Sequence, residues 1–300
     1  MRSLYRKYLH VSVGFEAFLE KDLIPNSSIF LTLEHVPPES LGGKGTILTC
    51  KKCNSESGRT LDAELLKYLE GIDFEQFLPN SKQSTPMTLN GKTINARINV
   101  EENGLINLHF DPNRSNPKIF AEVVNEIERA HSFDPDQITN LSGNIPRKKH
   151  DARIMEIALL RIAYLKLFQT FGYAALLNHG MLFIREQIAN PNKDILERPQ
   201  IMIADFPEGI SIIKSPIEIQ CFLVTFNLKT KSATRKFNVM LPGPSGVNID
   251  IYKNYRSFVL GNHEKSNVPL AMEYLPEKKY VSNLNLAFGY HYYWQTFTKS

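Results

Sequence analysis

A short segment near the N-terminus holds most of the side chains that can do chemistry. Glu34 and His35 are adjacent, and Asn54 directly follows a Cys50-Lys-Lys-Cys53 pair beyond a loop rich in proline and glycine. Hard cations such as Mg²⁺ prefer carboxylate, amide and phosphate oxygens, so Glu34 and Asn54 can hold one against a phosphodiester. An imidazole exchanges protons near neutral pH, so His35 can act as a general base toward water. These side chains together suit phosphodiester hydrolysis.

The elements around these side chains must bring them together. Residues 29–34 are rich in apolar and β-branched types and predict a strand, and residues 46–49 predict a second one. Leucines from Leu61 to Leu69 recur at helical spacing, which predicts a helix that begins near Cys53 and ends at Gly71. A strand, a loop, a strand and a helix in this order can make the carboxylate, the imidazole and the carboxamide converge.

The sequence of this segment resembles a known nuclease motif. The runs E-H-V-P-P, S-L-G-G and L-T-C-K-K-C-N are similar to the ββα-metal motif of the HNH endonuclease family. In that family two antiparallel strands and a helix surround one divalent cation, and the activity is the cutting or nicking of DNA. The resemblance covers about residues 29–70. It implies that His35 is the general base and that Glu34 and Asn54, the latter on the helix, are metal ligands of the catalytic set. It also implies Mg²⁺ or Mn²⁺ as cofactor and DNA as partner.

Two features depart from the family pattern. The asparagine that usually orients the catalytic histidine would fall near Gly45 or Thr46, and neither is Asn. Many family members also carry two CxxC pairs that bind a structural zinc, whereas this chain has only Cys50 and Cys53. Structural zinc needs four protein ligands. Either the zinc site is lost and apolar packing replaces it, or distant groups such as Cys221 complete a Zn²⁺ site.

Charged residues around the motif allow two interpretations. Asp62 is interpreted as a solvent-facing carboxylate of the first helical turn, with an approach to the metal as the alternative. Four cationic side chains suit phosphate contacts, and a solvated rim explains them equally well. They are Lys44, Lys51, Lys52 and Arg59.

The rest of the chain predicts a second domain. Residues 79–86, PNSKQSTP, are typical of a linker and divide a domain over residues 1–80 from an α+β domain over residues 87–300. The role predicted for the second domain is substrate positioning or regulation.

Within that domain, alternating apolar residues around Asn90-Gly91 predict a hairpin, and a helix is expected over residues 117–130. The longest helical pattern covers residues 151–177, with a break at Gly172, and its Arg161 and similar polar residues suit a core helix with a wet edge. Short apolar or β-branched segments after Pro199, including YRSFVL, predict an antiparallel sheet. The expected fold class is α+β: an N-terminal ββα-metal unit, then a larger mixed domain with a long central helix and a C-terminal antiparallel sheet.

Composition narrows the class of protein. The 300 residues are 42% hydrophobic and 22% charged, which is typical of a globular protein. The net charge of +4 is compatible with a polyanionic partner without requiring one. No apolar run is long enough to span a membrane. Three cysteines fit a reducing compartment, and the N-terminus lacks the apolar core of a signal peptide, so a cytoplasmic location is expected.

Two functions of different classes follow. The first is a metal-dependent DNA endonuclease, and two-part nucleases of this kind resemble bacterial phage-defence or mobile-element effectors. The alternative is a non-catalytic nucleic-acid-binding or scaffolding protein that has kept a degenerate HNH unit. No P-loop, GxGxxG or Ser-His-Asp pattern supports another chemistry.

Overall fold

The computed structural model places most of the chain in two compact units. The first unit combines residues 1–66, 151–229 and 234–300, and the second combines residues 67–150 and 230–233. The residues that the structure describes are 10–11, 31–131, 141–142, 149–198, 205–243, 251–261, 269–275, 283, 285–286 and 289. The predicted functional division at residues 80–87 stays a prediction.

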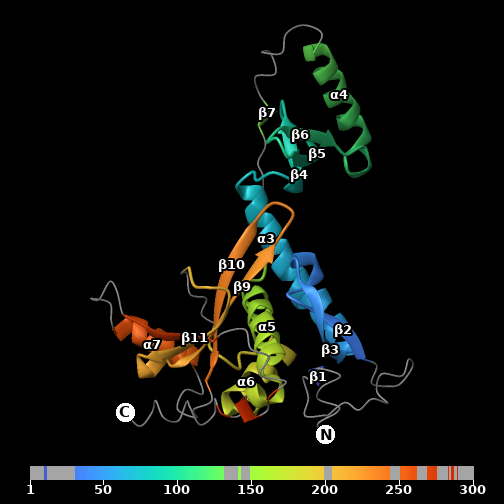
Figure 1. Ribbon diagram of the computed structural model, residues 1–300. Helices are drawn as coiled ribbons and strands as arrows, with labels where there is room; N and C mark the ends of the chain where they lie inside the picture. The colour runs from blue at the N-terminus through green and yellow to red at the C-terminus, as the bar shows by residue number, and fades with distance from the viewer. Residues whose placement is uncertain are drawn as a thin grey trace. The chain divides into compact units, whose positions relative to one another are not determined.

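The N-terminal part has the expected ββα order. Strand β2 (Leu31–Val36) pairs antiparallel with β3 (Lys44–Cys50), and β1 (His10–Val11) lies parallel to β3 on its other side. Helix α2 (Lys51–Ser57) begins directly after β3, which lies beside β2 in Figure 1. Helix α2 therefore follows strand β3 at Cys50 without an intervening loop.

A tight loop joins β2 to β3. It contains the 3₁₀ turn η2 (Glu39–Leu41), with Leu41 fully buried. Gly42 has φ of 85°, a left-handed conformation that favours glycine. A Cβ atom at Gly43 would lie 1.4 Å from the carbonyl oxygen of Pro37, so no side chain fits there. The L-G-G run thus fixes the return of the chain to the second strand.

The helical part after α2 runs further than predicted. A π-helical segment η3 (Gly58–Asp62) leads into α3 (Ala63–Glu75), so Gly71 lies inside a helix and is no C-cap. The prediction was wrong because Phe74 is buried in an apolar cluster with Met87, Ala96 and Ile98. Packing of this later turn outweighs the low helix propensity of one glycine, which is about 1 kcal/mol.

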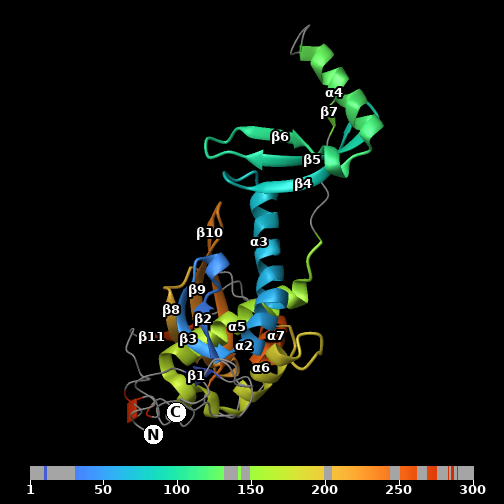
Figure 2. The same ribbon diagram turned by 90° about the vertical axis from the view of Figure 1, so that its right-hand side faces the viewer.

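The second unit contains a four-stranded antiparallel sheet of order β6-β5-β4-β7, covered by a helix (Figure 2). The hairpin at Asn90-Gly91 is confirmed, since both residues have positive φ. Val123 of the helix is fully buried against Leu89 and Ile94 of the sheet. The elements are β4 (Lys82–Leu89), β5 (Lys92–Val100), β6 (Ile106–Phe110), η4 (Pro112–Arg114), α4 (Pro117–His131) and β7 (Leu141–Ser142).

The linker predicted over residues 79–86 is incorrect, because much of it is strand β4. Pro86 misled the prediction, since proline cannot donate a ladder hydrogen bond. Among the described residues, β4 pairs with β5 along its length and with β7 at Thr88 and Leu89. Pro86 therefore lies outside the described β4–β7 pairs, at a position where a proline is tolerated.

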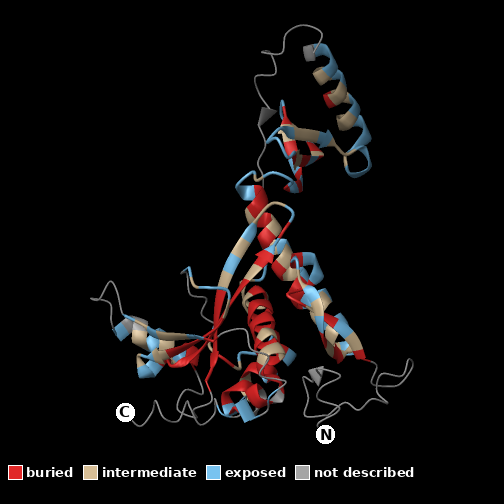
Figure 3. Ribbon diagram, viewed as in Figure 1, coloured by how far each residue is buried: buried red, intermediate tan, exposed pale blue. Residues whose placement is uncertain are grey.

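A long helix forms the centre of the first unit. Helix α5 (Ala152–Phe171) is buried along most of its length (Figure 3), and it contacts β2 and η3 as well as β9 and β10. Its break at Gly172 is confirmed, with φ of 62° and a 3₁₀ segment η6 (Gly172–Leu177) before α6 (His179–Ala189). The ββα part and the C-terminal sheet thus share this helix as a common core.

The C-terminal sheet is confirmed as antiparallel, with strand order β10-β9-β8-β11. The prediction of a strand at YRSFVL was wrong, because these residues lie in helix α7, in which Ile251 and Tyr252 are buried at the first turn. Residues 199–204 lie outside the described part. The elements are β8 (Gly209–Ser215), η7 (Ile217–Ile219), β9 (Cys221–Lys229), β10 (Thr234–Pro242), α7 (Ile251–Gly261) and β11 (Ala271–Leu275).

Among the described helices, none has the length and apolar character needed to cross a bilayer.

Candidate active site

Glu34 lies on the buried face of β2, with 2% of its surface exposed. Its Oε2 atom accepts a hydrogen bond from the Thr49 hydroxyl of β3 at 3.2 Å. The same oxygen pairs with Nη2 of Arg161 at 2.8 Å. Both donors that the described residues offer this carboxylate therefore meet at Oε2, and Oε1 is the oxygen left for another ligand.

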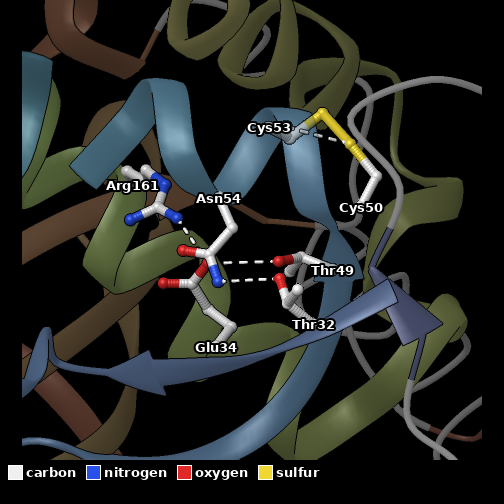
Figure 4. The surroundings of a disulfide bond; sticks show 7 residues. All are labelled: Thr32, Glu34, Thr49, Cys50, Cys53, Asn54 and Arg161. Carbon is white, nitrogen blue, oxygen red and sulfur yellow. Dashed lines mark hydrogen bonds and ion pairs between the residues drawn. A yellow bond between two sulfur atoms is a disulfide. The ribbon is translucent and has the colours of Figure 1, made fainter. Parts of the chain in front are cut away.

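Asn54 lies on the first turns of α2 and faces the same side of β2. Its Nδ2 group donates to the Thr32 hydroxyl at 3.1 Å and to the Leu33 carbonyl at 3.2 Å. Figure 4 shows the Asn54 amide and the Glu34 carboxylate on the shared face between the strand and the helix. Because the nitrogen is tied to the strand, Oδ1 is the atom of Asn54 available to a cation.

A buried ionic cluster supports these two residues. Nη1 of Arg161 lies 3.3 Å from Oδ1 and 3.4 Å from Oδ2 of Asp62. Arg161 and Asp62 are both buried, so Arg161 does not belong to the partly exposed edge of α5 and the expectation of a solvent-facing Asp62 was wrong. The cause is tertiary: α5 packs against β2 and η3, which brings one cation between two carboxylates. An arginine within the most apolar helical segment was the only sequence signal of this cluster.

The environment of Asp62 disfavours its charged form. Burial raises the pKa of Asp62 to about 6, although the Arg161 guanidinium lowers it, and the Glu34 carboxylate raises it further. Desolvation therefore outweighs the ion pair at this carboxyl group.

Asp62 is expected to make the fold less stable as the pH rises. The folded pKa of about 6 exceeds the ordinary value of 3.8, so the unfolded chain loses this proton first. As the pH rises from about 4 to about 6, the contribution of Asp62 to the free energy of unfolding should fall by about 3 kcal/mol in total. Urea unfolding of wild type and Asp62→Asn at about pH 4.5 and pH 7 measures it, because the variant lacks this titration. The wild type should lose stability relative to the variant as the pH rises, and a relative gain would contradict the prediction.

His35 is half-buried and follows Glu34 on β2. Successive side chains of a strand point to opposite faces, which places His35 on the side where Leu33 is 53% exposed. A β-bulge interrupts the pairing here: Glu34 is opposite Ile47 and His35 is opposite Gly45, so Thr46 is an extra residue on β3. The sequence predicted convergence of three side chains, and the structure brings Glu34 and Asn54 together while His35 lies across the strand.

The CxxC pair forms a disulfide between Cys50 and Cys53. The Sγ atom of Cys50 also accepts the backbone N–H of Cys53 at 3.0 Å and so caps α2. Zinc binds thiolate sulfur, so the predicted half-site for Zn²⁺ does not exist in this disulfide form. Cys221 is fully buried in β9, and burial raises the pKa of its thiol, which disfavours a thiolate ligand. The prediction of a structural zinc site at Cys50 and Cys53 therefore applies only to the chain in which this disulfide is reduced.

The four cations predicted to contact phosphate are all exposed, which phosphate binding requires. One lies at the start of β3, two in the first turn of α2 and one in η3. They are Lys44, Lys51, Lys52 and Arg59.

The donor set fits one hard divalent cation. Across the described residues, no three His, Cys, Asp or Glu side chains are grouped to hold a metal ion. Oε1 of Glu34 and Oδ1 of Asn54 instead offer two oxygens, the ligand type that Mg²⁺ and Mn²⁺ prefer, and Mg²⁺ usually keeps several waters. With Asp62 ionised, the three buried charges sum to minus one, so the cluster does not repel a cation by its net charge.

The comparison with protein families agrees with this geometry. Residues 21–70 match the family described as HNH endonuclease, which confirms the resemblance over about a sixth of the chain. This segment is therefore an HNH endonuclease unit. No curated protein and no solved structure matches the chain.

Proposed function

We propose that the protein is a metal-dependent endonuclease that hydrolyses phosphodiester bonds in DNA. The observation that carries the proposal is the placement of Glu34 and Asn54 on one face, within the segment that matches HNH endonucleases. Both residues present oxygen atoms there, and His35 follows at the end of the same strand. The support is thus the family of the segment together with the chemistry of three side chains.

Each residue has a separate task in this proposal. Glu34 and Asn54 hold one Mg²⁺ or Mn²⁺ ion through Oε1 and Oδ1. When bound, the ion offsets the charge that develops on the phosphate and on the leaving oxygen. The half-buried His35 lies on the other side of β2 from Glu34, so as a general base it would take the proton of the attacking water from beside the β-bulge near the end of the strand. The exposed cations at the start of β3, in α2 and in η3 hold the flanking phosphates.

The remaining parts of the proposal rest on the resemblance and on sequence character. We infer that residues 87–300 position the DNA or regulate cutting. A bacterial phage-defence or mobile-element role and a cytoplasmic location belong to the same proposal.

Two observations favour the alternative of a non-catalytic nucleic-acid-binding protein. Arg161 already pairs with Glu34, and a guanidinium can replace a metal ion as the partner of a carboxylate. Neither Gly45 nor Thr46 offers the amide that family members use to orient the histidine. A degenerate HNH unit would bind DNA without cutting it.

Plasmid nicking distinguishes the two functions. Supercoiled plasmid is incubated with the purified chain and Mg²⁺, Mn²⁺ or EDTA, and the appearance of open circles is followed over time. The endonuclease produces open circles only with metal. If no metal-dependent cutting of DNA occurs while the chain still retards the plasmid on a gel, the binding function replaces the proposed one.

A further inference from the structure

Arg161 is the one strongly basic residue inside the buried middle of α5. Its side chain is 6% exposed, while the helix around it is almost wholly apolar. Burying an unpaired cation is very unfavourable, so an arginine here requires partners. Both of them, Glu34 and Asp62, belong to the HNH segment, whereas Arg161 lies far outside residues 21–70.

The contacts of Arg161 determine how the Glu34 carboxylate is oriented. Nη2 reaches Oε2 of Glu34 from α5, and the Thr49 hydroxyl reaches the same atom from β3. Two donors from different elements fix both the position and the plane of the carboxylate. Nη1 meanwhile holds Asp62, so the guanidinium itself cannot rotate without breaking a second pair. Oε1 is thereby directed away from these donors.

We propose that Arg161 is a positioning residue that holds Glu34 in the orientation in which Oε1 meets a divalent cation together with Asn54. The inference rests on the proposed role of Glu34 as a metal ligand. It extends the site beyond the matched segment, because Arg161, which lies 127 residues after Glu34 in the chain, completes it. Outer partners of metal ligands typically change metal affinity by about 10-fold to 100-fold when removed.

The test measures Mn²⁺ affinity by electron paramagnetic resonance on folded protein without DNA. Arg161→Gln removes the charge, and Arg161→Lys keeps it but cannot bridge both carboxylates. Arg198→Gln is the matched control, because Arg198 is an exposed arginine that pairs with Glu156, a carboxylate of the same helix α5. We expect Mn²⁺ affinity to fall by about 10-fold to 100-fold in Arg161→Gln, by less in Arg161→Lys, and not at all in the control. The KM for DNA at saturating Mn²⁺ should stay near that of the wild type.

Equal Mn²⁺ binding in the Arg161 variants overturns the inference. Tighter binding also overturns it and means that the guanidinium competes with the metal. If Arg161→Gln does not fold, the Mn²⁺ affinity of Arg161→Lys alone tests the inference. A wild type that binds Mn²⁺ but does not nick DNA refutes the nuclease and leaves the affinity comparison valid. A wild type that binds no Mn²⁺ refutes the inference itself.

A separate observation concerns the open face of the sheet in the second unit. Side chains of β4 and β5 alternate, so Met87, Ile94, Ala96 and Ile98 are buried while the intervening residues are outward. The three long strands contain no aspartate or glutamate. Helix α4, on the other face, contains Glu122, Glu126 and Glu128. One carboxylate, that of Glu101 in the turn between β5 and β6, does reach the outward side, where it accepts a hydrogen bond from Asn107.

The outward face has side chains suited to a nucleic acid. The register aligns Ser84 with Arg97 and His109, and Lys82 with Asn99 and Asn107. Arg and Lys contact phosphates and guanine edges, and Asn contacts adenine edges. Two or more strands can enter a DNA groove, as β-ribbon readers do.

We infer that this outward face binds duplex DNA. The basic Lys82 and Arg97 outnumber the Glu101 carboxylate at this face, so the face suits a polyanion. The Asn99 amide, which can contact a base edge, favours DNA over an acidic peptide or over the acidic helix side of a second copy. The inference depends on the proposed function only for the choice of DNA, because binding needs neither metal nor turnover.

Binding of a fluorescent 30-base-pair duplex in EDTA tests this surface. Lys82→Glu with Arg97→Glu should weaken binding by about 10-fold or more and lower the slope of log affinity against log salt by about 2. Lys118→Glu with Arg129→Glu, on α4, makes the same change of charge and should have a much smaller effect. Equal losses in both pairs would mean a general charge effect and overturn the inference, as would tighter binding of an RNA duplex than of DNA. A wild type that binds the duplex but does not nick DNA would refute the nuclease and leave the inference about this face intact.

Discussion

His35→Ala is expected to lower the rate of metal-dependent plasmid nicking by about 100-fold to 10,000-fold, the range over which a positioned general base contributes. The imidazole is half-buried at the end of β2, beside the β-bulge that separates its pairing from that of Glu34. Alanine removes the proton acceptor and leaves the backbone ladder of β2 and β3 intact. Open-circle formation at saturating Mg²⁺ measures the effect.

The control for this substitution is His179→Ala, which removes an exposed imidazole from α6 in the same unit. His179→Ala should nick at the wild-type rate. His35→Ala should keep the wild-type affinity for Mn²⁺, because the proposed ligands are Glu34 and Asn54. Nicking by His35→Ala within a few-fold of the wild type would remove His35 from the mechanism, and a parallel loss of Mn²⁺ binding would make it a ligand.

Glu34→Ala is expected to have the largest effect on stability, a loss of about 3 kcal/mol or more. The reason is that breaking a buried ion pair leaves the other charge without compensation. Arg161 would keep only Asp62, whose burial already favours its neutral form. The same substitution removes the proposed metal ligand, so nicking should be lost as well. Urea unfolding and plasmid nicking on the same preparations measure the two effects.

Two further variants show whether the ion pair is the cause. Glu156→Ala breaks the pair with the exposed Arg198 and should lower stability by less than about 1 kcal/mol. Glu34→Ala combined with Arg161→Met removes both charges and should recover much of the stability, since apolar replacements of buried ion pairs are often neutral. It should recover no nicking. If the double variant is as unstable as the sum of the single ones, the Glu34–Arg161 pair does not carry the stability.

The local part of the site was readable because it depends on neighbours in the chain. Alternation, turn residues and helical spacing between Leu31 and Leu69 predicted two strands and a helix at the observed places. The L-G-G run predicted a loop, and the structure explains it by the contact of Gly43 with Pro37. Asn90-Gly91 predicted a hairpin for the same reason, because a type I′ turn requires positive φ.

Predictions failed where packing decided the outcome. Residues 79–86 have the composition of a linker, yet burial of Gln83 and Thr85 in one sheet face makes a strand of them. YRSFVL has strand character by composition, yet it belongs to α7, whose first turn is buried. Local propensity is worth about 1 kcal/mol per residue or less, so a few buried side chains outweigh it.

The sequence by itself determined which residue types are available for catalysis, their order, and the ββα frame that carries Glu34, His35 and Asn54. Only the tertiary structure decided which of these side chains lie close together. It directs Glu34 and Asn54 to one face, leaves His35 across the strand, joins Cys50 to Cys53, and brings Arg161 from α5 to the carboxylate of Glu34. The reason is physical: strand and helix periods are set by adjacent residues, whereas burial of an arginine between two carboxylates depends on packing of segments far apart in the chain.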